Sequence, residues 1–215
     1  MTTRSASSWT LPPIVHVLRE ATREAHDRLD ASSPVFAPNL ELSAYHLLLG
    51  RYLAAHLAAE HALERWAAAL ASRGVALNER RKVPLLRRDR ARTASLLATS
   101  DDEPRALSLS LPTLASAWGA LYVAEGSTLG AQHIMRTLAC SDLARHDGLN
   151  PDVGFTYFSS YGASTGEKWR QFLSALGEAD GADPGNRDTI VDGARSTFAL
   201  FERALSNDNP SPPAA

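Results

Sequence analysis

Long apolar runs, strand-like alternation and cysteine pairs are missing from this sequence of 215 residues, and each absence excludes a class of protein. No apolar run approaches the roughly 18 residues of a membrane-spanning helix, and Met1–Ser8 lacks the hydrophobic core of a signal peptide. The only cysteine, Cys140, cannot form a disulfide within the chain, which favours a reducing compartment. We therefore expect a cytoplasmic protein that does not cross a membrane.

Charge and motifs exclude further classes. The 22 basic and 24 acidic side chains give a formal net charge of −2, which argues against a general nucleic-acid-binding protein. The sequence contains no P-loop, no dinucleotide-binding fingerprint and no Cys/His spacing typical of zinc sites. Nucleotide and structural zinc sites are therefore not expected.

Helix-forming residues dominate what is present. Hydrophobic residues make up 44% of the chain, and much of that share is Ala and Leu. Period-2 runs of Val, Ile or Thr are absent, so strands have little to form from. The length fits one domain. The sequence predicts a single all-α domain over residues 11–206, with disordered segments at residues 1–10 and 207–215.

The apolar periodicity locates the expected helices. Pro12 and Pro13 suit a first helical turn, and Ser43 is a plausible N-cap. The basic run over residues 79–92, around Pro84, is typical of solvated surface, or alternatively of a docking patch for an acidic redox partner. We expect helices at about residues 12–30, 43–72, 92–99, 112–139, 163–176 and 187–205.

Two glycines interrupt the helix expected at residues 112–139. Each costs about 1 kcal/mol relative to alanine in a helix interior. Gly126 and Gly130 are four residues apart, so they remove the side chains from one patch of the same face. Such a patch indicates either close packing of two helices or the approach of something flat and bulky to the backbone.

The first expected helix carries a histidine between its apolar and polar faces. At 100° per residue, Arg19, Arg23 and His26 fall within about 60° of one another. A histidine in this position is most often structural. An imidazole flanked by guanidinium groups would also suit a ligand that needs a nitrogen donor at its centre and cations for acidic groups at its edge.

A second group of residues could suggest a metal site. His46, His56, Glu60 and His61 lie on one predicted helix, with His56 and Glu60 at i, i+4. A di-iron helical bundle would need two Glu-x-x-His pairs, and no glutamate in the chain has a histidine three residues later. We interpret these side chains as part of a polar or half-buried helix face.

Three segments together resemble the heme oxygenase family, in particular its bacterial, biliverdin-forming branch. They are LREATREAHDRL (Leu18–Leu29), LYVAEGSTLG (Leu121–Gly130), and YFSSYGA (Tyr157–Ala163) continuing to KWR (Lys168–Arg170). Their order and spacing extend over roughly residues 14–205. The resemblance implies an all-helical bundle with heme between a proximal N-terminal helix and a distal helix kinked at glycines.

The resemblance also implies which residues contact the iron and the heme faces. His26 matches the proximal ligand of iron, and Gly126 and Gly130 match the bare patch of the distal helix. Ser127 stands where animal enzymes have aspartate and where bacterial relatives often have serine. These residues would leave hydrogen bonding on the distal side to backbone amides, the Ser127 hydroxyl and ordered water.

Other matched positions concern the heme propionates. Arg19, Tyr122 and Arg170 resemble the groups that hold them, and Arg23 is a further candidate. Contacts of this kind fix the rotation of heme in its site, and this rotation determines which meso carbon reacts.

The activity implied is the oxidative opening of heme b, which is both substrate and cofactor, to biliverdin, carbon monoxide and ferrous iron. The resemblance implies that the reaction uses O2. The electrons must come from another protein, because the sequence contains no flavin or iron–sulfur motif. A ferredoxin or a similar reductase is the expected donor. The reaction would serve either iron acquisition or the supply of biliverdin to a bilin photoreceptor, and the sequence leaves both open.

Two positions and two alternatives remain open. Ala131 stands where many relatives have a third glycine and could tighten the pocket, and His133 could rotate inward as a second ligand of iron. These departures leave a non-catalytic heme carrier or sensor as an alternative. A thiaminase-like enzyme of the same helical superfamily would need a cysteine nucleophile in its pocket, and Cys140 is poorly placed for that role.

Overall fold

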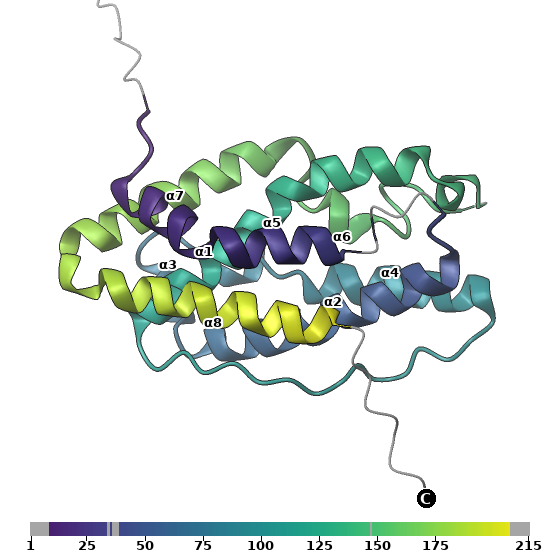
Figure 1. The fold of residues 1–215 in the computed structure, drawn as a ribbon, viewed down its shortest axis with the longest axis horizontal. Coiled ribbons are helices and arrows are strands. Elements are labelled where there is room, and N and C mark those ends of the chain that lie inside the picture. Colours follow the sequence, from purple (N-terminus) through teal and green to yellow (C-terminus); the bar gives the residue numbers. More distant parts are fainter. Residues whose placement is uncertain (1–8, 34, 36–38, 147, 207–215) are drawn as a thin grey trace, which may run out of the picture.

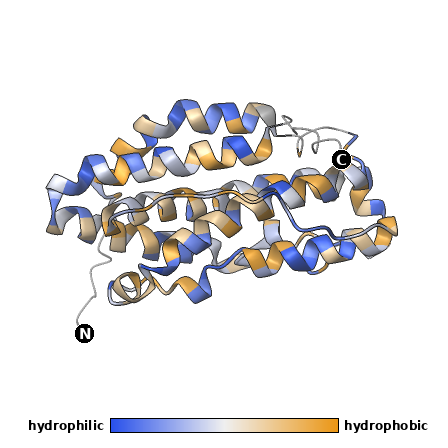
Figure 2. Cartoon of the chain, turned by 90° about the horizontal axis from the view of Figure 1, so that it is seen from below, coloured by the Kyte–Doolittle hydropathy of each residue, from blue (hydrophilic) through white to orange (hydrophobic). Residues whose placement is uncertain are grey.

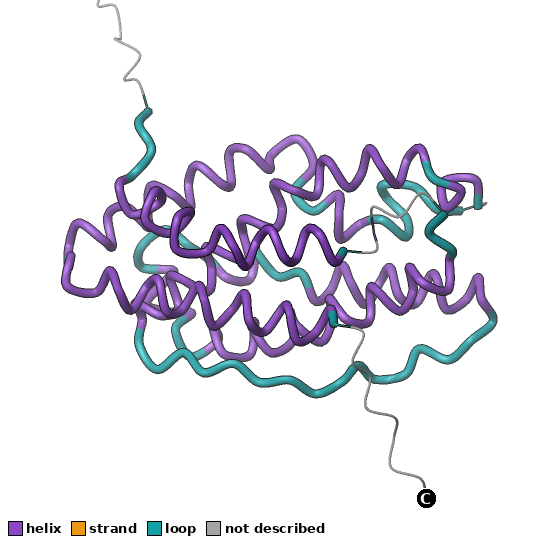
Figure 3. Tube along the Cα trace, in the orientation of Figure 1, coloured by secondary structure: helices purple, strands orange, loops and turns teal. Residues whose placement is uncertain are grey.

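A computed structural model describes residues 9–33, 35, 39–146 and 148–206 of the chain. Over these residues it contains helices and loops but no strands (Figures 1 and 3), with only isolated bridges from Asn150 to Val153 and Gly154. The predicted all-α class is confirmed. The helices are α1 Pro13–Ser32, α2 Leu42–Glu64, α3 Ala67–Ala71, α4 Val83–Leu97, α5 Leu114–Cys140, α6 Thr156–Ser159, α7 Thr165–Ala182 and α8 Arg187–Leu205, with 3-10 turns η2 Leu77–Glu79, η3 Asp142–Arg145, η4 Gly162–Ser164 and η5 Pro184–Asn186.

The bundle is organised around the packing of α5 against α8. Helix α8 also contacts α1 and α2, while α4 packs on α2, and α7 covers part of both α1 and α5 (Figure 1). Residues 98–113 link α4 to α5 as a long segment without helix that runs along the outside of the bundle (Figures 1 and 3).

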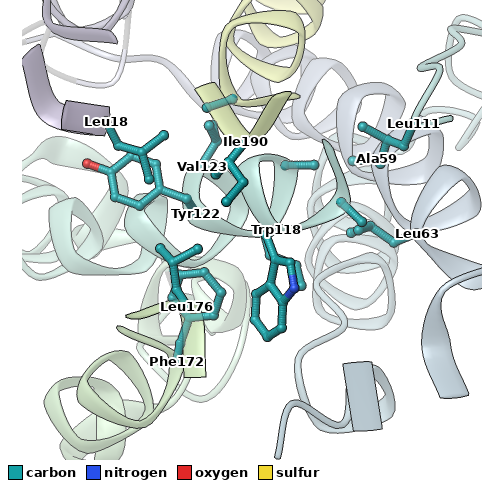
Figure 4. Packing of buried hydrophobic residues seen from close by; sticks show 14 of the residues in the cluster. Leu18, Ala59, Leu63, Leu111, Trp118, Tyr122, Val123, Phe172, Leu176 and Ile190 are labelled. Atoms are coloured by element: carbon teal, nitrogen blue, oxygen red, sulfur yellow. The ribbon is translucent and has the colours of Figure 1, made fainter. Parts of the chain in front are cut away.

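Amphipathic helices supply the core. Hydrophobic and hydrophilic residues alternate along the helices (Figure 2), as expected where each helix buries one stripe and exposes the other. In the larger buried cluster, Trp118 of α5 packs beside Phe172 of α7, with Leu18, Tyr122 and Ile190 close by (Figure 4). A second cluster surrounds Tyr45 and lies between α2, the end of α5 and α6. Full burial of side chains of this size contributes about 1.5–3 kcal/mol each.

The α5–α8 crossing depends on a pair of glycines. A Cβ at Gly119 would collide with the backbone of Ile190 and Ala194, and a Cβ at Gly193 would collide with the backbone of Ser116. Each helix therefore lies against the bare backbone of the other. This contact fixes the position of α5, the helix that also carries Gly126 and Gly130.

Several helix boundaries agree with the prediction, and the last helix matches it at both ends. At the start of α5, the Thr113 hydroxyl accepts a hydrogen bond from the backbone N–H of Ser116 at 3.1 Å, and the Ser116 hydroxyl completes a capping box. The predicted 43–72 helix is wrong in one respect. It is divided at Arg65 and Trp66, so that α2 is followed by the short α3.

Two further boundaries are corrected by the structure. The helix predicted at residues 92–99 begins at Val83, because Pro84 lies in its first turn, where a missing N–H costs nothing. The helix predicted to end at Leu176 continues through Gly177 to Ala182, since an isolated glycine weakens a packed helix but does not end it. Of the segments predicted to be disordered, 1–10 and 207–215, residues 1–8 and 207–215 lie outside the described residues. No helix among the residues that the structure describes is both long and apolar enough to span a membrane.

Candidate functional site: a cleft between α1 and α5

A cleft of about 390 Å³ opens between α1 and α5 and is closed at its sides by α7 and α8. This volume lies within the range of small-molecule sites. Its walls are largely apolar or aromatic, with a few charged groups contributed by α1. The lining residues are Arg19, Thr22, Arg23, His26, Asp27, Leu29, Asp30, Ser33, Tyr52, Tyr122, Val123, Gly126, Ser127, Leu129, Gly130, Ile134, Trp169, Phe198, Phe201 and Leu205.

The two glycines predicted to matter leave one wall of this cleft bare. A Cβ at Gly130 would meet no atom within 4 Å, and a Cβ at Gly126 would meet only the ring of Trp169, at 3.7 Å. Close helix packing occurs instead at Gly119, seven residues earlier. Of the two interpretations of this glycine pair, the structure therefore favours the one in which a ligand approaches the backbone.

His26 contributes an imidazole to the α1 wall. Its side chain is 61% exposed, and its Nδ1 lies 3.2 Å from Oδ2 of Asp30, one helical turn later. The ring also meets Phe198 of α8 edge to face, with centroids 6.3 Å apart. A carboxylate at Nδ1 favours the tautomer that has its proton there, which leaves Nε2 as the electron-pair donor.

Arg19 and Tyr122 join the two walls at another part of the cleft. The Tyr122 hydroxyl is hydrogen-bonded to Arg19, and burial raises the pKa of this phenol while the neighbouring guanidinium opposes that rise. The Tyr122 ring packs on Trp169 of α7, with centroids 5.8 Å apart. Arg23, also exposed in the cleft, lies one turn from Arg19. The group presents cations and a hydroxyl to an acidic ligand.

Ser127 anchors a hydrogen-bonded chain that leads from the cleft into the core. Its hydroxyl donates to the carbonyl oxygen of Ala124 at 2.8 Å and is hydrogen-bonded to Tyr157. The Tyr157 hydroxyl lies 2.9 Å from Nε2 of His56. Burial lowers the pKa of His56 to about 3, so this imidazole is neutral at physiological pH and cannot supply a charge to the site.

Other residues singled out in the sequence lie outside the cleft. Arg170 is exposed on α7, and its neighbour Trp169 lines the cleft instead. Ala131 is 4% exposed, packs into the Tyr45 cluster and is not among the lining residues of the cleft. His133 is exposed and is not among the lining residues. Cys140 is the last residue of α5, and its side chain is outside what the structure describes.

The residues weighed as a metal cluster have separate partners. His46 shares a hydrogen bond with Thr93, with Nδ1 and Oγ1 2.8 Å apart. One carboxylate oxygen of Glu60 accepts from the backbone N–H of Lys82 and Val83, at 2.6 and 3.0 Å. His46 and His56 are 7% and 1% exposed, so the prediction of a polar or half-buried position was wrong for both.

Sequence reasoning missed much of the cleft. Asp30 could have been found from its i, i+4 spacing to His26, which is a usual pattern for a carboxylate that orients an imidazole. The apolar contributors Phe198, Phe201 and Trp169 carry no such signal, because their spacing is the same as that of ordinary core residues.

The sequence and the fold are similar to those of known heme oxygenases. The family model described as heme oxygenase matches residues 13–207. Among solved structures, the NO- and CO-bound heme oxygenase from Neisseria meningitidis is 23% identical, with a TM-score of 0.71 over 96% of this chain and 99% of that one. The heme oxygenase from Leptospira interrogans is 19% identical, with a TM-score of 0.67 over 90% of this chain and 98% of that one. None of the curated proteins compared matches significantly. A family match over nearly the whole described chain, on an all-helical fold shared with two bacterial enzymes, shows that the chain belongs to the heme oxygenase family.

Proposed function

We propose that this chain opens the ring of heme b to form biliverdin, carbon monoxide and ferrous iron, using O2 and electrons from an external donor. The observation that carries the proposal is the cleft in which the imidazole of His26 and the bare patch at Gly126 and Gly130 belong to the same cavity. One wall offers a ligand for a metal, and the other offers space for a flat ring to lie against backbone.

The residues fit heme on three separate counts. The imidazole of His26 is oriented by Asp30 and keeps Nε2 for iron. The open space at Gly130 admits a planar group that any larger side chain would exclude. Tyr52, Trp169, Phe198 and Phe201 give the apolar lining that a porphyrin requires.

The acid-binding end supports an orientation for the ligand. Arg19, Arg23 and the Tyr122 hydroxyl are suited to the two propionates, because guanidinium groups bind carboxylates through charge-assisted hydrogen bonds. We assign Arg19 and Tyr122 to this role first, since they already bridge α1 and α5. Arg170, which lies outside the lining, would need to move in order to contribute.

Heme itself, when bound, supplies the redox-active iron and the carbon that is oxidised. The chain contributes a distal wall without imidazole or carboxylate: the α5 residues of the lining are Tyr122, Val123, Gly126, Ser127, Leu129, Gly130 and Ile134. Ser127 offers a hydroxyl whose direction is set by Ala124 and Tyr157. Catalytic roles for Gly126, Ser127 and Gly130 are thus steric fit and hydrogen bonding. A ferredoxin or a similar reductase would provide the electrons, and a photoreceptor that binds bilin is one destination for the product.

The proposal is tested by an absorbance time course in air. The purified chain is mixed with hemin and then given ferredoxin, its reductase and NADPH. We expect the heme band to decay while a biliverdin band grows, and His26→Ala to lose this activity unless imidazole is added. Heme that binds tightly but survives reduction in air would support the carrier alternative instead. An unchanged spectrum and turnover in His26→Ala would exclude His26 as the ligand of iron.

A further inference from the structure

Beside the glycine patch, at the flank of α5 and outside the cleft, lies a buried carboxylate. Tyr122, Val123, Gly126 and Ser127 line the cleft, whereas Glu125 belongs to a separate small cavity. Glu125 is 1% exposed and stands directly before Gly126 in the chain. A fully buried carboxylate persists only where cations or hydrogen-bond donors compensate for its lost hydration.

Two segments far away in sequence provide these partners. Arg80, from the segment between η2 and α4, donates from its guanidinium to Oε2 of Glu125, and the two side chains are 4% and 2% exposed. The Tyr161 hydroxyl donates to Oε1 at 2.8 Å and lies 3.2 Å from Oε2. The carboxylate thus ties α5 to the chain before α4 and to the chain before α7.

Lys82 completes the cluster. Its Nζ lies 3.6 Å from Oε1 of Glu125 and 3.8 Å from the centre of the Tyr161 ring. This ammonium is 2% exposed and is buried beside both groups. The adjoining cavity, of about 30 Å³, is large enough for a water molecule that could serve it.

We propose that Glu125 is a positioning residue whose carboxylate, held by Arg80, Tyr161 and Lys82, sets the rotation and depth of α5 at the Gly126–Gly130 patch. A helix with one bare face has few side chains on that face to hold it in place. Its position must therefore be set by side chains on its other faces. The glycine crossing at Gly119 fixes α5 against α8, and the Glu125 cluster fixes it again two turns later, next to the patch.

The same cluster is linked to a second wall of the cleft. Lys168 of α7 pairs with Glu79, the residue before Arg80, with Nζ and Oε2 2.7 Å apart. Trp169, which follows Lys168, is the side chain that a Cβ at Gly126 would meet. Displacement of the 79–82 segment would consequently reach the cleft through α5 and through α7. The consequence for heme rests on the proposed function, but the placement of α5 does not.

The test uses the full chain, first without heme. In Tyr161→Phe the ring stays and one donor to Glu125 is lost. We expect amide hydrogen exchange in residues 121–131 to rise about tenfold, the size expected for a lost buried hydrogen bond, while exchange in α8 stays near its original rate. Glu125→Gln should enlarge the same local effect. Tyr45→Phe is the control, because it removes a hydroxyl, more deeply buried than that of Tyr161, that donates to the Gly154 carbonyl at 2.8 Å in the other cluster.

The second readout uses hemin. If α5 is mispositioned, Tyr161→Phe should alter the absorbance of bound heme and the ratio of biliverdin isomers, and Tyr45→Phe should not. Exchange that is unchanged over residues 121–131, or that rises equally throughout the chain, would overturn the positioning role whether or not heme is degraded. Altered exchange in a chain that binds no heme would instead leave the positioning role standing and reject the proposed function.

Discussion

At the scale of single residues, the pair formed by His26 and Asp30 determines how well the imidazole can serve as a ligand. The carboxylate at Nδ1 favours the tautomer that keeps Nε2 as the electron-pair donor, and it holds the ring in one orientation. We expect Asp30→Asn to weaken heme binding about tenfold or more, because orienting partners of this kind typically contribute 10–100-fold. Titration with hemin, followed by absorbance, measures the change.

The control for this substitution lies on the same helix. Glu24 is exposed on α1 and does not line the cleft, so Glu24→Gln removes the same charge without touching the imidazole. Equal weakening in the two variants would show that general electrostatics, rather than the Asp30 contact, governs affinity.

His56 makes the stability of the chain sensitive to acid. Its pKa is lowered from 6.5 to about 3 by burial, whereas in the unfolded chain it returns to the ordinary value. Between these two pKa values, His56 is therefore protonated in the unfolded state and neutral in the folded state. This contribution to stability is complete above pH 6.5 and is lost as the pH falls toward 3, by up to about 1.4 kcal/mol per pH unit.

His56→Gln, which keeps a donor for Tyr157, should flatten the dependence of unfolding free energy on pH between about 4 and 6. Urea denaturation at several pH values measures the slope. His61→Gln serves as the control, because His61 is exposed on the same helix and should leave the slope as it is. A wild-type slope in His56→Gln would contradict the assignment.

The polar residues of the site could be predicted from the sequence only where helical spacing or a motif indicated them. Arg19, Arg23, His26 and Tyr122 were named from the sequence, and the structure brings all four to one cleft. Their roles toward heme stay predictions. The position of Ala131 outside the cleft could not be predicted from the motif. Packing against neighbouring helices, and not the motif itself, determines which side of a helix faces the ligand.

At the scale of helices, glycines that look alike in sequence have opposite uses. Gly193 is buried against the backbone of Ser116, whereas Gly181 of α7 has no atom within 4 Å of where its Cβ would be. We expect Gly193→Ala to lower the unfolding free energy by about 1–3 kcal/mol, the usual range for overpacking, because backbone must move. Gly181→Ala should instead raise it, by up to about 1 kcal/mol, through helix propensity.

Urea denaturation of the two variants checks this opposition. If both substitutions changed the unfolding free energy in the same direction, the close contact of α5 and α8 would not be the reason for the glycine at position 193. Circular dichroism of each variant verifies that the helices are retained.

The existence of most helices could be predicted from the sequence, but their interruptions could not. Apolar periodicity is a local property, so it located α1, α5 and α8 within about two residues at each end. The division between α2 and α3 and the continuation of α7 through Gly177 depend on contacts from other helices. Proline and glycine end helices on average, and the prediction relied on this tendency. At Pro84 and Gly177, however, the position within a packed helix determines whether the helix continues.

At the scale of the whole molecule, the cleft links ligand binding to global stability. Its walls come from α1, α5, α7 and α8, so a ligand that fits it binds only the folded chain. Hemin at about 100 times its dissociation constant should raise the unfolding free energy by about 2.7 kcal/mol. Denaturation with and without hemin measures the gain, and His26→Ala should show much less of it. An equal gain in that variant would place the bound hemin outside this cleft.

The span of the cleft along the chain also has a consequence for biosynthesis. Arg19 of α1 is synthesised well before Phe198, Phe201 and Leu205 of α8. A nascent polypeptide that has not yet completed α8 lacks one side of the cavity, even if its earlier helices have formed. Competence to take up the ligand is thus acquired only after α8 has been synthesised and has packed against the earlier helices.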